Sequence, residues 1–148
     1  MGEIIREYYE DGELKSEIYT INGKKNGYYK SYHISGQLDE ICNYIDDKVN
    51  GEYKRYHING QLTCIGNFID NKMNGCYKFY HRYNGQLACI CNYTYGELNG
   101  EYKIYDMDGQ LGEICNYIDG KKNGLCKKYD IYGILVEESN YIMGEIIS

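Results

Sequence analysis

The sequence lacks proline and tryptophan, contains only two phenylalanines, and has no long apolar run. A membrane-spanning helix needs about 20 consecutive apolar residues, so this absence excludes one. The first residues carry neither a basic segment nor an apolar stretch, so we expect no secretory signal and an intracellular, cytoplasmic protein. The formal net charge of −6 argues against nucleic acid as a partner, because nucleic-acid binding needs a basic surface.

Tyrosine, glycine and cysteine are abundant instead, with 20, 18 and 7 copies among 148 residues, and their positions repeat. The pair Asn-Gly recurs every 24 or 25 residues, at Asn26-Gly27, Asn50-Gly51, Asn74-Gly75, Asn99-Gly100 and Asn123-Gly124. A second glycine follows the same period, at Gly12, Gly36, Gly60, Gly85, Gly109 and Gly133. We therefore predict one repeat domain over residues 1–148, with copies at about 2–26, 27–50, 51–74, 75–99, 100–123 and 124–148.

Each copy contains two short runs rich in strand-forming residues, such as 52–57 and 61–68, separated by Asn and Gly. Asn and Gly supply the positive φ angles of tight turns, so we expect the Asn-Gly pairs to form turns without proline. The predicted fold is all-β, an elongated, twisted antiparallel β-meander or solenoid of about six 24-residue β-hairpins with about twelve strands.

Side chains alternate between the two faces of a strand, which predicts the composition of each face. In the second run of one copy, Leu62, Cys64, Gly66 and Phe68 should share a face. We assign to the core these positions and the residues Tyr29, Tyr53, Tyr77, Tyr102 and Cys126 of the first runs. Because tyrosine lines both faces, the sequence does not decide which face is the core.

A Lys-x-Tyr pattern recurs on the other face of the first run. We define the stripe as Lys30, Tyr32, Lys54, Tyr56, Lys78, Tyr80, Lys103, Tyr105, Lys127 and Tyr129. It is our candidate interaction surface, which would bind an acidic partner or a lipid headgroup. The alternative, which we favour, is that lysine stems cover tyrosine rings while their amines reach water.

The histidines and cysteines also occupy repeat positions. His33, His57 and His81 could form a metal ladder, but equivalent positions in successive hairpins lie about 10 Å apart, too far for one zinc ion. We therefore interpret them as polar residues at strand ends. The cysteines resemble small core residues, with a cross-strand disulfide between Cys115 and Cys126 as the alternative if Tyr117 pairs with Gly124. No catalytic, cofactor-binding or metal-binding residue is predicted.

The core pattern Y-K-x-Y-x-x-x-G-Q-L, together with the Asn-Gly pair, resembles the MORN repeat in its short variant form. The best copies are 51–74 and 100–123, whereas the first shifts its Tyr19 and the last replaces Gln-Leu with Ile134-Leu135. The resemblance implies a hairpin array that acts as a protein-interaction or assembly scaffold. Relatives are linked to phospholipids or dimerisation, and in bacteria to antitoxins. Richness in Ile, Asn, Lys and Tyr is typical of AT-rich genomes, such as those of large DNA viruses.

The first five residues, Met1-Gly-Glu-Ile-Ile5, recur as Met143-Gly-Glu-Ile-Ile147. The chain would thus end by beginning another strand like its first, and open strand edges invite pairing. Homo-oligomers formed through the terminal edges are one expectation. Our leading hypothesis for function is a non-enzymatic scaffold for an unknown protein partner. The alternatives are a module that binds lipid headgroups at a membrane surface, and an antitoxin-like inhibitor.

Overall fold

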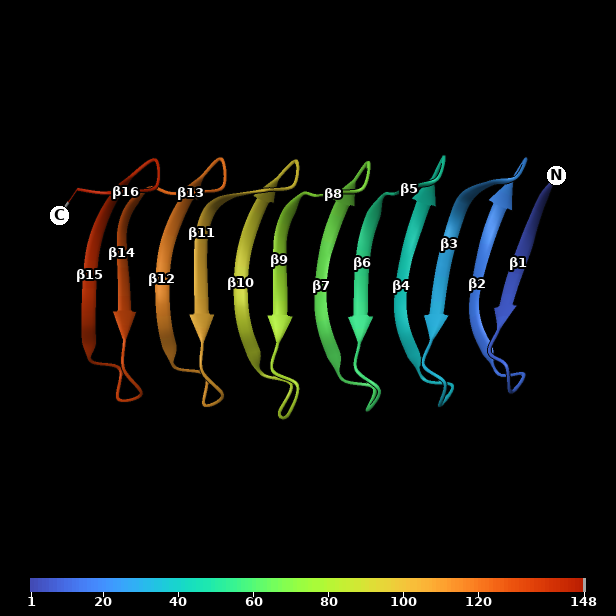
Figure 1. Cartoon of the computed structure of the whole chain (residues 1–148), viewed down its shortest axis with the longest axis horizontal. Helices are drawn as coiled ribbons and strands as arrows, with labels where there is room; N and C mark the ends of the chain where they lie inside the picture. Colours follow the sequence, from blue (N-terminus) through green and yellow to red (C-terminus); the bar gives the residue numbers. More distant parts are fainter. Residues whose placement is uncertain (148) are drawn as a thin grey trace. The chain divides into compact units, whose positions relative to one another are not determined.

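The computed structural model describes residues 1–147, and this part of the chain contains sixteen β-strands and no helix (Figure 1). Consecutive strands pair antiparallel, which confirms the predicted all-β meander of hairpins. The chain divides into two compact units, Met1–Lys72 and Met73–Ser148, each described here by itself. Within residues 1–147 no helix is long and apolar enough to cross a membrane.

The first unit is an antiparallel sheet in the strand order β1-β2-β3-β4-β6-β7, with β5 paired to β4. Its strands are β1 (Gly2–Tyr8), β2 (Leu14–Ile21), β3 (Lys24–Tyr32), β4 (Leu38–Ile45), β5 (Lys48–Val49), β6 (Gly51–Tyr56) and β7 (Leu62–Ile69). The two-residue strand β8 (Lys72–Met73) lies at the boundary of the units.

The second unit follows the same plan, in the order β9-β10-β11-β12-β14-β15-β16, with β13 paired to β12. Its strands are β9 (Gly75–Tyr80), β10 (Leu87–Thr94), β11 (Glu97–Tyr105), β12 (Leu111–Ile118), β13 (Lys121–Lys122), β14 (Gly124–Tyr129), β15 (Leu135–Ile142) and β16 (Glu145–Ile146). The four two-residue strands β5, β8, β13 and β16 account for the difference from the predicted twelve.

The Asn-Gly pairs do not form the tight turns, so that prediction is wrong. Five of the turns are the two-residue pairs that come just before an Asn-Gly pair, and a sixth lies near the end of the chain. Both residues of each turn have positive φ: 22–23, 46–47, 70–71, 95–96, 119–120 and 143–144. Such pairs match the right-handed twist of the strands that they join. Tyr44 pairs with Val49, and Ile41, three residues earlier, pairs with Lys54, which lies five residues after Val49. The segment from Val49 to Lys54 therefore contains two residues more than the segment of β4 that it faces. The Asn-Gly pair therefore forms a bulge, where only its glycine has positive φ.

The second set of glycines lies in turns as predicted. In one of them Gly36, with φ 82°, donates its N–H to the carbonyl of His33, whose own N–H donates to the carbonyl of Gln37. The corresponding turn of the second unit runs from His81 to Gln86 and contains one more residue. This single insertion explains why one repeat has 25 residues, since the strands on either side keep their register.

The repeated terminal pentapeptide has different structures at its two occurrences. Gly2 begins β1, whereas Met143 and Gly144, with φ of 49° and 96°, form the turn between β15 and β16. The prediction that the second copy begins a strand therefore holds only for Glu145–Ile146. The reason is that the two copies start at different positions of the repeat.

The core occupies one face, which the structure identifies by burial. Its buried residues are Ser16, Ile18, Thr20, Cys42, Cys64, Tyr77, Cys91, Cys115 and Cys126. Large and small residues alternate along a row, because each core tyrosine of a first strand lies opposite cysteine or glycine on the next strand. The pairs are Tyr29 with Cys42, Tyr53 with Gly66, Tyr77 with Cys91, and Tyr102 with Cys115. The assignment of these tyrosines to the core face was correct.

The leucines of the second strands do not belong to that face, contrary to prediction. Ser31 pairs with Glu40 but Tyr32 pairs with Leu38, so Asp39 is an extra residue and the strand bulges there. The bulge reverses the alternation, and Leu38 lines a groove with Ile41 and Lys54 on the opposite face. The same register shift occurs after Leu62, where Thr63 is the extra residue opposite Arg55 and Tyr56.

Candidate interaction surface

The stripe lies on the face opposite the core. In β6, Lys54 lies between Tyr53 and Arg55 and faces Ile65 across the hairpin, while the ring of Tyr53 packs on Phe68 at 5.3 Å. The lysines are partly covered, since between 27% and 36% of the side-chain surface is exposed at Lys30, Lys54, Lys103 and Lys127. Within each unit the repeat therefore places these lysines at equivalent positions of the first strands.

Carboxylates neutralise most of the stripe. Lys54 pairs with Glu52 at 2.5 Å and Lys103 with Glu101 at 2.6 Å, each along the same strand. The hydrogen bond from each lysine to its glutamate raises the lysine pKa. Across strands, the ion pairs are Lys30 with Glu17 at 3.8 Å and Lys127 with Glu138 at 3.3 Å. The stripe is thus a surface of alternating charge and not a basic one.

We expected the stripe lysines to cover the stripe tyrosines, but Lys30 covers a different ring. The amine of Lys30 lies 5.5 Å from the ring centre of Tyr28, which precedes it, and not over Tyr32. Tyr32 instead donates its hydroxyl to Glu17 at 3.5 Å. Burial and the nearby Glu17 carboxylate raise the pKa of Tyr32. Its phenol therefore keeps its proton at physiological pH and donates it to Glu17.

A groove of about 330 Å³ is present on the stripe face of the first unit. Its lining comes from β3, β4 and β6 and includes Tyr28, Leu38, Ile41, Lys54 and Tyr56. Aliphatic and aromatic side chains therefore lie beside a charged pair, since Glu52 also lines the groove. This combination is typical of surfaces that bind protein partners, where aromatic anchors are surrounded by polar groups.

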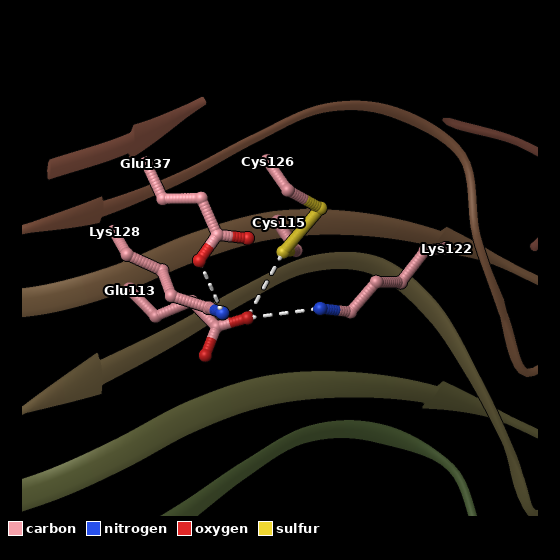
Figure 2. The surroundings of a disulfide bond; sticks show 6 residues. All are labelled: Glu113, Cys115, Lys122, Cys126, Lys128 and Glu137. Atoms are coloured by element: carbon pink, nitrogen blue, oxygen red, sulfur yellow. Dashed lines mark hydrogen bonds and ion pairs between the residues drawn. A yellow bond between two sulfur atoms is a disulfide. The ribbon is translucent and has the colours of Figure 1, made fainter. Parts of the chain in front are cut away.

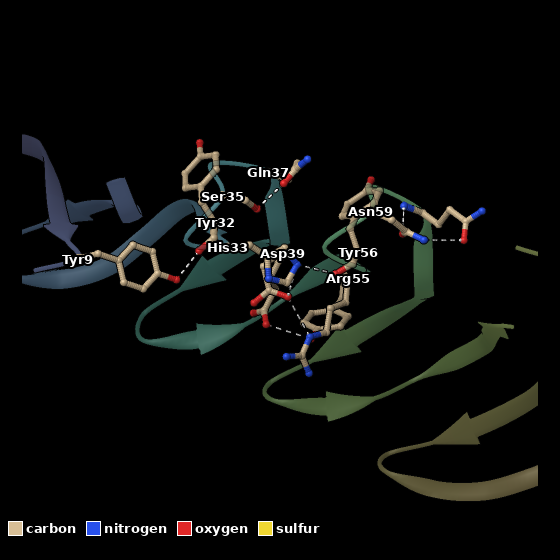
Figure 3. A network of polar contacts seen from close by, with 12 residues as sticks. Tyr9, Tyr32, His33, Ser35, Gln37, Asp39, Arg55, Tyr56 and Asn59 are labelled. Carbon is tan, nitrogen blue, oxygen red and sulfur yellow. Dashed lines mark hydrogen bonds and ion pairs between the residues drawn. The ribbon is translucent and has the colours of Figure 1, made fainter. Parts of the chain in front are cut away.

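The histidine position holds neighbouring hairpins together. The Nε2 of His33 lies 3.1 Å from the carbonyl oxygen of Tyr56, and that of His81 lies 2.9 Å from the carbonyl oxygen of Tyr105. A carbonyl only accepts, so each Nε2 carries the proton. Tyr9 occupies the same position in the first hairpin and donates its hydroxyl to the carbonyl of Tyr32 at 2.6 Å (Figure 3).

This bond between hairpins is a role that the sequence reasoning missed. In the last copies Asp106 and Asp130 replace histidine and accept N–H groups of their own turns instead, as Asp106 does from Gln110 at 2.8 Å. The interpretation of His33 as a strand-end polar residue was therefore incomplete. Among residues 1–147 no group of three metal-ligating side chains is close enough to hold a metal ion.

Residues 4–22, 25–46 and 49–70 match the MORN repeat variant family. Residues 4–70 carry variant MORN repeats. All three matched segments lie in the first unit, and they cover the hairpins β1–β2, β3–β4 and β6–β7. A separate comparison with curated proteins gives no match.

The asparagine of the Asn-Gly pair has a specific contact in the second unit. The side-chain oxygen of Asn74 accepts the N–H of Tyr95 at 3.4 Å, and that of Asn123 accepts the N–H of Met143 at 3.2 Å. Each therefore holds the tight turn of the next repeat. The Asn-Gly pair therefore has two structural roles. Its glycine adopts the positive φ of the bulge, and its asparagine accepts a hydrogen bond from the neighbouring turn.

The last repeats contain a disulfide between Cys115 of β12 and Cys126 of β14 (Figure 2). Their Cα atoms are 4.4 Å apart, the distance of directly opposite residues that exchange no backbone hydrogen bonds. Cys126 stands where the other copies have the core tyrosine, which is why two cysteines meet here. Of the two readings of this pair, the structure therefore shows the cross-strand disulfide.

A second cysteine position has unusual electrostatics. Hydrogen bonds from Cys91 and from the hydroxyl of Tyr102 lower the pKa of Cys89 to about 7. The same contact and burial raise the pKa of Cys91, which is 1% exposed. Cys89 is half-buried, so its thiolate is the one expected to react with small electrophiles.

Proposed function

We propose that this protein is a non-enzymatic repeat scaffold that binds a protein partner through the stripe face of its MORN repeats. The observation that carries the proposal is the groove between Tyr28 and Tyr56, which combines Leu38 and Ile41 with the ion pair of Lys54 and Glu52. Aromatic anchors with partly covered charges suit a protein surface, because specificity then comes from shape and paired charges.

The charge balance supports a protein partner more than a lipid surface. Attraction to an anionic membrane contributes about 1 kcal/mol for each lysine or arginine near the surface. Four of the five stripe lysines have a carboxylate within 4 Å, and the whole chain has a net charge of −6. The stripe therefore offers little net positive charge to lipid headgroups.

Affinity capture with matched variants tests the proposal. The stripe variant carries Lys54→Ser and Tyr56→Ser, and its control carries Lys15→Ser and Tyr83→Ser, the same changes at exposed positions. We expect a partner identified by mass spectrometry to be retained by wild type and the control and lost from the stripe variant. Equal capture by both variants would reject the stripe as the binding face. Salt-sensitive co-sedimentation with anionic liposomes, lost in the stripe variant, would replace the protein partner by a membrane.

We further propose that the protein works in the cytoplasm. Cys42, Cys76, Cys89 and Cys91 are free thiols, which suits a reducing compartment. The disulfide between Cys115 and Cys126 would then form only under oxidising conditions. Alkylation of thiols in intact cells before lysis, followed by peptide mass mapping, tests this, because a fully oxidised pair in vivo would contradict the cytoplasmic setting.

Self-association through strand edges is a second proposal for the partners of this chain. Every residue of β1 is exposed, and β1 pairs with β2 on one side. Exposed edges with free N–H and C=O groups can pair with another chain. Light scattering on the full chain and on one lacking residues 143–148 should show a larger mass for the full chain. A monomeric mass for both would reject this proposal.

A further inference from the structure

The first hairpin lacks the pair of aromatic rings that the next four hairpins share. Ring pairs occur at Tyr29 and Tyr44 (5.9 Å between centroids), Tyr53 and Phe68 (5.3 Å), Tyr77 and Tyr93 (6.1 Å), and Tyr102 and Tyr117 (5.5 Å). In the first hairpin, Ile5 faces Ile18 as Tyr29 faces Cys42, and Thr20 faces Glu3 as Tyr44 faces Gly27. Ile5 and Thr20 therefore occupy the two ring positions.

The missing ring has moved to the other face of the sheet. Tyr19 comes one residue before the ring position, and a shift of one residue turns a strand side chain to the opposite face. There its ring stacks on Tyr28, with centroids 6.5 Å apart and planes at 20°. Gly2 and Gly27 leave space for it, because a Cβ atom at either would meet the ring of Tyr19.

A cavity of about 320 Å³ remains where the rings would lie. Ile5, Ile18, Thr20, Lys25 and Tyr29 are among the residues that line it. A cavity of about 150 Å³ lined by apolar groups is enough to bind benzene. The space beside Thr20 is therefore large enough for one aromatic ring, and Ile5, which is 46% exposed, marks its open side.

Two hydroxyl groups that line this cavity already have acceptors within the chain. Ser16 donates its hydroxyl to Glu7, and Thr20 donates its hydroxyl to the backbone carbonyl of Glu3, both at 3.4 Å. Ser16 is 7% and Thr20 3% exposed, so both are buried. Neither hydroxyl therefore needs a hydrogen bond from the occupant. The charged side chains of Glu7, Lys25 and Asp47 also line the cavity.

Lys25 supplies the remaining feature of the site. It lies directly opposite Thr20 in the sheet, and its amine is 5.8 Å from the ring centre of Tyr29 and 5.0 Å from that of Tyr44. A ring seated over Thr20 would lie beside the same amine. Cations within about 6 Å of an aromatic face are attracted to it, which favours an aromatic guest over an aliphatic one.

We propose that the cavity at Ile5, Thr20 and Lys25 receives one aromatic side chain, tyrosine or phenylalanine, from a protein partner. The proposal rests on the scaffold function above and specifies one side chain that the partner must present. The argument comes from the repeat itself, because the equivalent space of the next hairpins is filled by Tyr44, Phe68, Tyr93 and Tyr117. The partner's ring completes the pattern that the first hairpin leaves incomplete.

The probe for this proposal is p-cresol, the side chain of tyrosine, titrated into the full chain and followed by methyl resonances in NMR spectra. We expect saturable shifts at Ile5, Ile18 and Thr20, and a binding at least threefold weaker for 4-methylcyclohexanol, which has no aromatic face. Thr20→Tyr should fill the cavity, abolish the shifts and raise the urea midpoint of unfolding. The matched control, Thr94→Tyr at an exposed strand end, should bind p-cresol as wild type does.

A second variant keeps the test valid if Thr20→Tyr fails to fold. Lys25→Met removes the cation at similar size and should weaken p-cresol about two- to fivefold, as expected for an exposed cation–π contact. Unshifted methyls in wild type, or undiminished binding by Thr20→Tyr, would overturn the proposal while leaving the stripe experiment unaffected. A wild-type dimer that Thr20→Tyr dissociates would replace the partner protein with a second copy of this chain.

Discussion

The disulfide between Cys115 and Cys126 should stabilise the last repeats measurably. It closes a loop with a sequence separation of 11 residues. Constraining an unfolded loop of this length corresponds to roughly 3 kcal/mol at 25 °C. Both cysteines are buried, at 1% and 6% exposure, so their thiols would stay in the core after reduction. The main change on reduction is therefore the greater freedom of the unfolded chain.

Native-state hydrogen exchange with mass spectrometry measures this effect locally, which is necessary because repeat proteins can open one segment at a time. Reduction should lower the opening free energy of β12 and β14 by roughly 3 kcal/mol and leave β2 and β3 unchanged. Cys126→Ser should reproduce the loss and no longer respond to reductant, whereas Cys42→Ser, which replaces a buried free thiol and keeps the disulfide, should respond to reductant as wild type does. If reduced wild type stays within about 0.5 kcal/mol of the oxidised protein, the reasoning is refuted.

Three further predictions concern the aromatic core and its titration. Tyr77→Ala, at 4% exposure, should cost roughly 3–5 kcal/mol of unfolding free energy, whereas Tyr83→Ala, at 77%, should cost under about 0.5 kcal/mol in urea titrations. Burial raises the pKa of Tyr44 and Tyr93 to about 12, from about 10 unfolded. The unfolded chain therefore loses protons first, and stability should fall as pH rises from 10 to 12, in step with absorbance at 295 nm. Cys89, with its lowered pKa, should be the half-buried thiol that iodoacetamide alkylates at pH 7.

These three have separate outcomes that would contradict them. Equal losses at Tyr77 and Tyr83 would mean that the row of alternating tyrosines and small residues is not the core. A flat stability between pH 10 and 12 would contradict the burial of Tyr44 and Tyr93. Alkylation of Cys89 that is unchanged by Tyr102→Phe would show that the tyrosine hydroxyl does not stabilise its thiolate.

The hairpin repeat could be predicted because its period and its strand-forming residues are visible in the sequence. The position of the tight turns could not, since both Asn-Gly and the pairs before it, such as Asp46-Asp47, favour positive φ. Only the pairing of Tyr44 with Val49 shows which pair turns the chain. The predicted face of Leu38 was wrong for a related reason, because a bulge at Asp39 reverses the alternation of side chains between the two faces.

The candidate surface could be predicted in its residues but not in its electrostatics. The stripe lysines follow from alternation, and Glu52 could have been recognised because it lies two residues before Lys54 on the same face. The bond from His33 to the carbonyl of Tyr56 joins residues 23 apart and requires the distance between hairpins. Its signal was the recurrence of histidine beside a turn. The alternative of a link between Cys115 and Cys126 was based on a pairing of Tyr117 with Gly124, which is wrong, because Tyr117 pairs with Lys122. The two extra residues that follow Lys122 bring the cysteines opposite each other.

The alternating row of the core also constrains how such a chain can change length in evolution. Tyr29 faces Cys42 and Tyr53 faces Gly66, so one whole repeat starts with a large residue and ends with a small one. Duplication or loss of about 24 residues by recombination therefore keeps every large residue against a small one. An event of half that length would place two tyrosines or two small residues together, and selection should remove it. Cys126 shows the exception, where a small residue meets a small one and a covalent bond joins them.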